Sequence, residues 1–295
     1  MAGEPSHELA EVLESETHVD MDKLLSLCRY GVPERLRAET WKYLLGVSRP
    51  ERSEELTLGK RMEQEYLELC KAWQVLPHSD LARNVRNDVR KHRADHSYFR
   101  DPRMRQRLEN VLRCYVQAQG GQYWPGMVHL LAPLAQVYPT EVEMYFTFQE
   151  LMKRLALSMS FDGVKQMSVT FMTLLRHILP ELYLFLEEEQ CAGGSWLTSW
   201  MQMLLSKELP LPCVLRLWDT YLSYITLNLS EASSSLQQLH VYVCLAILEA
   251  CHEEVTELDD TEVLWYLQHL PTFDMDQIIT QAFNIKEDVV AQSIL

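Results

Sequence analysis

The sequence has few glycines, no excess of positive charge and no long uninterrupted apolar run. Its 295 residues include only 10 glycines, while Leu, Glu, Met, Ala and Gln are abundant, which favours helix. The formal net charge of −15 argues against a general nucleic-acid binder, because neutralising phosphates requires an excess of Lys and Arg. No stretch reaches the roughly 18 apolar residues that cross a bilayer. We therefore expect neither a nucleic-acid partner nor direct membrane insertion.

The motifs of several enzyme classes are also missing. There is no Gly-rich loop ending in Gly-Lys-Ser or Gly-Lys-Thr, so we do not expect the chain to hydrolyse GTP or ATP by itself. No His-Glu-x-x-His, no zinc-spaced Cys and His cluster and no Gly-x-Ser-x-Gly elbow occurs. The expectation is a protein without a cofactor or a metal site.

The seven cysteines do not resemble a disulfide framework. Their number is odd and no two have Cys-x-x-Cys spacing, so we interpret them as reduced, mostly buried thiols of a cytosolic protein. The first 16 residues contain no basic or apolar run of the kind that a signal peptide needs. We expect a cytoplasmic location, with any membrane association peripheral and through a partner.

Apolar residues recur at three- and four-residue steps along most of the chain, which indicates helices. The first clear helix follows Pro33 and is expected to end at Gly46, a suitable C-terminal cap. The run 127–138 is apolar on nearly all sides and should lie in the core. No alternating strand pattern and no fixed-period repeat is evident. The predicted fold class is all-α, a single large multi-helix domain, with a helical solenoid as the structural alternative.

The composition suggests three segments along the chain. Residues 1–22 carry seven acidic residues and no Lys or Arg, so we expect 1–24 to be an acidic lead-in that is loosely ordered or marginally helical. Residues 25–285 form the predicted helical domain, because no Gly/Pro-rich linker divides them. Residues 286–295 are expected to be a C-terminal tail.

One segment of this acidic chain is strongly basic. Between Arg83 and Arg113 there are ten Lys and Arg residues against four acids. Charge alone leaves two interpretations open: a solvated helical surface, or a docking face for an anionic partner or the phosphates of a bound nucleotide.

Four segments, in this order, carry recognisable motifs. YGVPERLRAETWKYLLG at 30–46 precedes VRNDVRKHRADHSYF at 85–99, which is similar to I-x-x-D-hydrophobic-x-R-T. YWPGMVHLLAPL at 123–134 is similar to Y-x-Q-G-M followed by an apolar helix, and ELPLPCVLRLWDTYL at 208–222 carries a hydrophobic-R-hydrophobic-W-D signature. This ordered set resembles the motifs of the TBC (Tre2–Bub2–Cdc16) family of activating proteins for Rab GTPases, the first segment being similar to the family's opening motif. The resemblance spans roughly 25–270 and implies an all-helical domain that docks on a GTP-bound, Rab-type small GTPase.

The resemblance also implies a mechanism. An arginine from the second motif would stabilise charge on the transferring phosphoryl group, and a glutamine from the third would position the attacking water. This sequence has Lys91 at the arginine position and Pro125 at the glutamine position. Lysine keeps the charge but lacks the planar fork of arginine, and proline has no side-chain donor or acceptor. The candidate catalytic positions are therefore degenerate.

Further site residues follow from the same motifs. Neighbours that could replace the missing side chains are Arg90, Arg93 and Gln122. A helical Arg93 would require a register shift, because two residues turn a side chain by about 200°. The residues expected to contact the partner are Arg86, Asp88, Tyr123, Gly126 and Met127.

The remaining motif residues suggest structural roles. Trp41, Trp218 and Tyr123 are interpreted as core anchors, Arg37, Arg216 and Asp219 as members of buried ion pairs, and His177 and His240 as hydrogen-bonded packing residues.

Three functions remain open. The favoured hypothesis is a Rab-binding module without catalysis. The second is an active GTPase-activating protein that uses Lys91 or a neighbouring arginine. The third is an interaction domain that has also lost GTPase binding.

Overall fold

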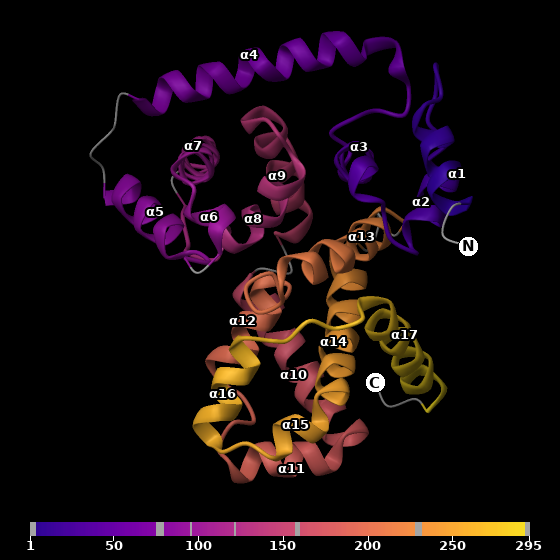
Figure 1. Ribbon diagram of the computed structural model, residues 1–295, viewed down its shortest axis with the longest axis vertical. Helices are drawn as coiled ribbons and strands as arrows, with labels where there is room; N and C mark the ends of the chain where they lie inside the picture. Colours follow the sequence, from indigo (N-terminus) through magenta and orange to yellow (C-terminus); the bar gives the residue numbers. More distant parts are fainter. Residues whose placement is uncertain are drawn as a thin grey trace. The chain divides into compact units, whose positions relative to one another are not determined.

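The computed structural model of the chain describes residues 4–74, 80–94, 96–120, 122–156, 160–227 and 232–292. Helices dominate throughout (Figure 1). Over the described ranges, the extended backbone pairing consists of one isolated antiparallel bridge between His18 and Glu51. The all-α prediction is therefore confirmed.

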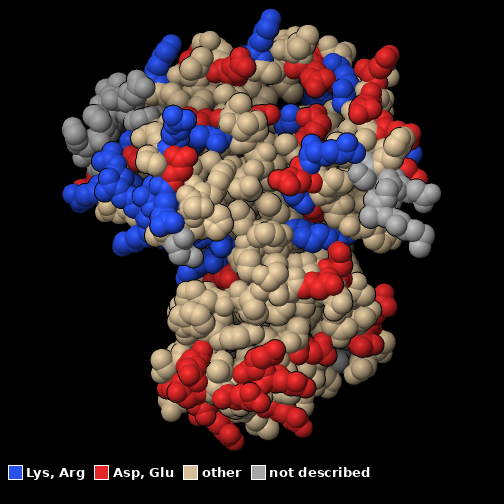
Figure 2. Space-filling view, viewed as in Figure 1, with Lys and Arg blue, Asp and Glu red and all other residues tan. Residues whose placement is uncertain are grey.

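The chain divides into two compact units, Met1–Lys153 and Arg154–Leu295. The units differ sharply in charge. The first carries 21 Lys and Arg against 23 acids, whereas the second carries six against 19. The overall acidity of the chain thus belongs almost entirely to the second unit, and Figure 2 shows Asp and Glu spread over its visible face.

The helices of the first unit are α1 (Glu4–Leu13), α2 (Met21–Cys28), α3 (Glu34–Leu45), the short 3-10 helix η1 (Arg52–Glu54), α4 (Glu55–Gln74), α5 (Asp80–Lys91), α6 (Ser97–Arg100), α7 (Pro102–Ala118), α8 (Met127–Val137) and α9 (Glu141–Leu155), whose last two residues lie beyond the unit boundary. α7 is the organising helix, because it contacts α4, α5, α6 and α8. It can do so because its buried residues spread over most of its circumference rather than along one stripe. α8 is buried on nearly all sides, as its composition predicted.

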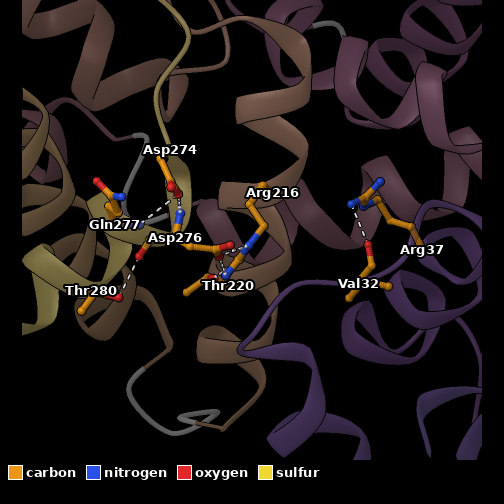
Figure 3. A network of polar contacts seen from close by, with 8 residues as sticks. All are labelled: Val32, Arg37, Arg216, Thr220, Asp274, Asp276, Gln277 and Thr280. Atoms are coloured by element: carbon orange, nitrogen blue, oxygen red, sulfur yellow. Dashed lines mark hydrogen bonds and ion pairs between the residues drawn. The ribbon is translucent and has the colours of Figure 1, made fainter. Parts of the chain in front are cut away.

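The first motif forms the expected helix. α3 follows Pro33 and ends at Gly46, which adopts a left-handed conformation with φ of 76°. Trp41 is fully buried, as predicted for a core anchor. The guanidinium of Arg37 donates a hydrogen bond to the Val32 carbonyl over 2.7 Å and fixes the turn that leads into the helix (Figure 3).

The N-terminal segment, expected to be loosely ordered or marginally helical, contains two helices. Residues 4–24 contain α1 and the start of α2, and the two helices pack on each other. Their few apolar side chains, including Leu9, Val19 and Leu24, are almost completely buried. Asp20 caps α2 by accepting a hydrogen bond from the Lys23 amide. A sparse set of well-placed apolar residues is therefore enough to hold this acidic segment in place.

The helices of the second unit are α10 (Phe161–Ile178), α11 (Pro180–Glu188), α12 (Ser195–Met203), α13 (Leu211–Leu227), α14 (Ala232–Ala250), α15 (His252–Thr256), α16 (Asp260–Gln268) and α17 (Met275–Ala291). α14 runs through this unit and contacts α10, α12, α13, α15 and α17 (Figure 1). α17 continues to Ala291, past the predicted domain end at 285, because Val289 is still buried.

A polar group lies at the centre of the second unit. His240 on α14 is fully buried; its Nε2–H donates to the Trp200 carbonyl over 2.9 Å, and its Nδ1 accepts from the Tyr221 hydroxyl over 2.7 Å. Burial lowers the pKa of His240 to about 4, so the ring is neutral at pH 7. The predicted packing role of His240 is confirmed. The same prediction for His177 is wrong, because this residue is exposed in the last turn of α10.

In the described part of the chain, no single helix is both long and apolar enough to span a membrane. α10 and α11 together reach the required length and composition, but they are bent by 115° at the break between them.

Candidate functional site

The basic motif forms helix α5, which is amphipathic with a narrow apolar face. Ala82, Val85 and Val89 are buried, and α5 contacts α7. The intervening positions carry polar and charged side chains. Lys91 is the last residue of the helix and is exposed. A cation at this end is favoured by the partial negative charge of the C-terminal carbonyls.

The backbone leaves the helical path directly after Lys91. His92 is buried, and Arg93 is half-buried with a left-handed φ of 39°. Because α5 has already ended, the side chain of Arg93 does not follow the helical rotation that we assumed for it. Arg90 remains in the last turn and is exposed beside Lys91.

The third motif forms the approach to α8. Gln122 and Pro125 are exposed, while Tyr123 is half-buried rather than a core anchor. Gly126 and Met127, which we predicted as partner contacts, are buried at the start of α8 and support the loop from the core side. The Pro125 carbonyl accepts a hydrogen bond from the Val128 amide, which makes this proline part of the first turn.

Two contacts bring the second and third motifs together. The Tyr123 hydroxyl donates to Oδ2 of Asp88 over 2.8 Å. Burial and this hydrogen bond raise the pKa of Tyr123, so the phenol keeps its proton and acts as the donor. Just past the end of α5, Nδ1 of His92 lies 3.1 Å from Nδ1 of His129, with the two rings packed edge to face. The segments carrying Lys91 and Pro125 are therefore fastened to each other on both sides.

The electrostatics of the histidine pair are defined by burial. Burial, with contributions from His129 and Arg93, lowers the pKa of His92 to about 2. His92 is thus neutral at physiological pH, and the Nδ1–H of one ring donates a hydrogen bond to Nδ1 of the other. Phe99 of α6 packs edge-on against His92, with ring centroids 4.8 Å apart.

Arg86 has a different role from the one expected. It lies 3.2 Å from the Glu109 carboxylate of α7, and Glu109 also pairs with Arg113 one turn further on. Glu109 and Arg113 are both buried, so this three-residue group ties α5 to α7. Arg86 is still half-exposed, but its charge is largely neutralised by the carboxylate of Glu109.

Five of the other basic residues are exposed and form a patch, the α5–α6 basic face. We define it as Arg83, Arg90 and Lys91 of α5, Arg100 of α6 and the adjoining Arg103 in the first turn of α7. Figure 2 shows Lys and Arg gathered over this region at the left of the view. Arg83 pairs with Asp80 over 2.9 Å, and both side chains are exposed. Within the described ranges, the remaining four residues of the face have no ion pair. Lys91 thus lies at the edge of a surface with unneutralised positive charge.

The fourth motif is structural. Arg216 on α13 pairs with Asp276 of α17 over 2.6 Å and donates to the Thr220 hydroxyl over 2.8 Å (Figure 3). The ion pair is as predicted, although Asp276 is 70% exposed rather than buried. Trp218 and Asp219 are buried, and Trp218 is a core anchor as expected.

Sequence reasoning missed the His92–His129 pair and the Arg86–Glu109 link. His92 was visible only as a departure from the threonine that follows the arginine in the resembled motif. Nothing in the sequence connects it to His129, which lies 37 positions further on.

Comparisons with known proteins agree with this architecture. The family model described as the Rab-GTPase-TBC domain matches residues 34–256. Human TBC1 domain family member 22A is 23% identical over 91% of this chain and 57% of its own length. GTPase-activating protein gyp1 of Schizosaccharomyces pombe is 25% identical over 90% of this chain and 58% of its own length. The chain therefore spans about three fifths of the length of these curated relatives.

Solved structures show the same fold. The crystal structure of the Ypt/Rab-GAP domain of Gyp1p superposes with a TM-score of 0.82 at 20% identity and covers 96% of this chain and 98% of its own. The Chlamydomonas flagellar RabGAP TBC domain superposes with a TM-score of 0.67 at 20% identity, covering 90% and 84% of the two chains. The family match, which covers most of the sequence, decides the assignment: this chain belongs to the Rab-GTPase-TBC domain family.

Proposed function

We propose that this chain binds a Rab-type small GTPase in its GTP-bound state without accelerating GTP hydrolysis. Membership of the Rab-GTPase-TBC domain family and the names of its relatives support a Rab partner. The α5–α6 basic face and the loop before α8 are the surface that we assign to this partner. Exposed, unneutralised cations suit the phosphates and acidic side chains of a nucleotide-loaded GTPase.

The proposed lack of catalysis rests on one observation, the presence of Pro125 in the loop before α8. It occupies the position of the expected water-positioning glutamine, and it is built into the first turn of α8. A pyrrolidine ring can neither donate nor accept a hydrogen bond, so it cannot orient an attacking water. Gln122 is exposed three residues earlier but precedes the Tyr123–Asp88 anchor, which fixes the loop in its present register.

The arginine position retains charge but not geometry. Lys91 offers one compact ammonium in place of a planar guanidinium, whose fork can bind two phosphate oxygens at once. Lys91 therefore supports attraction to phosphates better than it supports transition-state stabilisation.

The alternative is an active GTPase-activating protein that uses Lys91 or Arg90. Their exposure, side by side at the end of α5 and without an ion pair in the described chain, favours this second candidate. It still requires a water-positioning group from elsewhere, for example from the GTPase itself.

Single-turnover GTP hydrolysis and binding, measured over a panel of Rab GTPases, separate these functions. We expect the chain to bind the GTP-loaded form of at least one Rab without changing the rate at which that Rab hydrolyses GTP. Arg103→Ala should weaken this binding. The matched control is Lys60→Ala, which removes an exposed cation of α4 outside the α5–α6 basic face. Acceleration by the wild type would overturn the non-catalytic proposal in favour of the active one, and its loss in Lys91→Ala or in Arg90→Ala would identify the side chain responsible.

A gain-of-function variant tests the same reasoning from the opposite direction. Lys91→Arg combined with Pro125→Gln restores both expected side chains, and we expect it to accelerate hydrolysis by the Rab that the wild type binds. An arginine finger alone contributes roughly 10³–10⁵ in rate, so even a poorly aligned restoration is measurable. Absence of binding to any GTP-loaded Rab would instead identify an interaction domain that has lost its GTPase. A cytoplasmic location, peripheral on membranes through the bound Rab, completes the proposal.

A further inference from the structure

Two cysteines from different helices lie in contact in the first unit. Sγ of Cys70 on α4 is 3.5 Å from Sγ of Cys114 on α7. The two residues are 44 positions apart in the chain and are not bonded to each other. Cys70 is half-buried, whereas Cys114 and the other five cysteines are buried. A half-buried thiol that touches a second thiol differs from the other five cysteines, which are all buried.

The neighbouring contacts hold these two sulfurs in register. One turn before Cys70, the Tyr66 hydroxyl donates to Glu141 over 2.8 Å. One turn before Cys114, the Asn110 amide donates to the other oxygen of the same carboxylate over 3.0 Å. Residues four apart share a helix face. The contacts of Tyr66 and Asn110 with Glu141 therefore align α4 and α7 so that the cysteines one turn further along meet.

We propose that Cys70 and Cys114 form a reversible disulfide when the chain meets a hydroperoxide such as hydrogen peroxide. The sulfurs need to close by about 1.5 Å to reach the bond length of a disulfide. This requires rotation of both side chains about their Cα–Cβ bonds, while the contacts of Tyr66 and Asn110 with Glu141 hold the two helices in place. The inference is independent of GTPase binding.

The chemistry assigns a different role to each sulfur. The Cys70 thiolate, nearer to solvent, attacks one peroxide oxygen; the O–O bond breaks, a water leaves and a sulfenic acid remains. The Cys114 sulfur then attacks Sγ of Cys70, the S–O bond breaks and a second water leaves as the S–S bond forms. Two thiols lose two electrons and two protons in total, and one peroxide becomes two waters. Cys114 is the resolving cysteine because burial hides it from the oxidant but not from Cys70.

The cross-link would enclose the whole of α5 in a covalent loop. Cys70 precedes this helix and Cys114 follows it, so Asp88 and Lys91 lie inside the closed segment. Closing a loop of this length restricts the unfolded chain and also limits local opening of α5. The chain-entropy model predicts a rise in thermal midpoint of about 5–10 °C on oxidation.

Mass spectrometry of the full chain tests this assignment directly. The protein is treated with hydrogen peroxide, quenched in acid, alkylated in denaturant and digested without reductant. Before alkylation we expect an intact mass lower by about 2 Da, and after digestion a single cross-linked peptide pair joining Cys70 to Cys114, both reversed by dithiothreitol. Recovery of Cys114 as an alkylated thiol beside Cys70 sulfinic acid, or a cross-link between other cysteines, would overturn the proposal.

Variants separate the disulfide from general oxidation. Cys70→Ser should abolish both the mass loss and the oxidation-dependent rise in thermal midpoint, while Cys251→Ala, which alters a buried cysteine of the second unit, should leave both unchanged. Hydrogen exchange of the wild-type chain provides a readout that needs no variant. Amides of α5 should exchange more slowly after oxidation, and equal exchange in both redox states would contradict the enclosed loop.

Discussion

Replacing Tyr123 by phenylalanine removes the hydroxyl that joins the third motif to α5 and leaves the ring in place. The phenol donates to the Asp88 carboxylate over 2.8 Å, and both residues are half-buried. A hydrogen bond to a charged partner stabilises a fold by about 1.5–3 kcal/mol. Partial exposure to water places this one at the lower end, so we expect Tyr123→Phe to lower the free energy of unfolding by about 1.5 kcal/mol.

A double-mutant cycle with Asp88→Ala isolates the interaction from the loss of either side chain alone. Unfolding by urea is measured for the wild type, both single variants and the double variant, and we expect a coupling energy of about 1 kcal/mol or more. Tyr30→Phe is the matched control, because the side chain of Tyr30 is 81% exposed and its hydroxyl should contribute little. Amides at 122–128 should also exchange faster in Tyr123→Phe. A coupling energy below about 0.3 kcal/mol would refute the idea that this bond fastens the two motifs together.

Three further predictions concern stability. The pKa of His240 falls to about 4 on folding, so the native state binds fewer protons than the unfolded state. The contribution of His240 to the free energy of unfolding is therefore complete above about pH 6.5 and decreases by on the order of 3 kcal/mol as the pH falls towards 4. Urea unfolding at pH 7 and pH 4.5 should detect this decrease in the wild type and a smaller one in His240→Asn. Arg216→Leu removes the ion pair with Asp276 and should cost about 1 kcal/mol, whereas an unchanged urea midpoint would mean that solvent screens this pair completely. Leu130→Ala in the buried helix α8 should cost about 2–5 kcal/mol, and the same substitution at Leu56, which is 84% exposed, should cost far less; similar losses at both sites would contradict the placement of the core.

Much of the helical framework could be predicted from local sequence because it depends on near neighbours. Apolar residues three and four apart share a helix face, so the helices around Trp41, along 103–117 and at 127–138 were all recognisable. Gly46 also ended its helix as expected, because a left-handed cap strongly favours glycine.

Helices with little apolar surface were harder to predict. α1 and α2 lie in an acidic segment, and α5 keeps only a stripe of Ala82, Val85 and Val89 towards the core. Short helices of this kind gain most of their stability from tertiary packing, which a local pattern does not contain. The division of the chain into two compact units is likewise a property of contacts, since no Gly/Pro-rich linker marks it.

The candidate site shows the same contrast. The substitutions Lys91 and Pro125 were visible in the sequence as departures from a resembled motif, and they stay predictions about catalysis until hydrolysis is measured. Arg86, in contrast, resembled a partner contact in the sequence, yet it is held by Glu109 of α7. Charge along one helix cannot reveal whether an acid from another helix already neutralises it.

By itself, the sequence determined the helical class, the family motifs and the two residues that stand where catalytic side chains would be expected. Only the tertiary structure decided which side chains meet. It joined Tyr123 to Asp88, His92 to His129 and Cys70 to Cys114, all pairs that lie 35 to 44 positions apart. The physical reason is that helical periodicity fixes which face a residue occupies, whereas the packing of one helix on another fixes what that face touches.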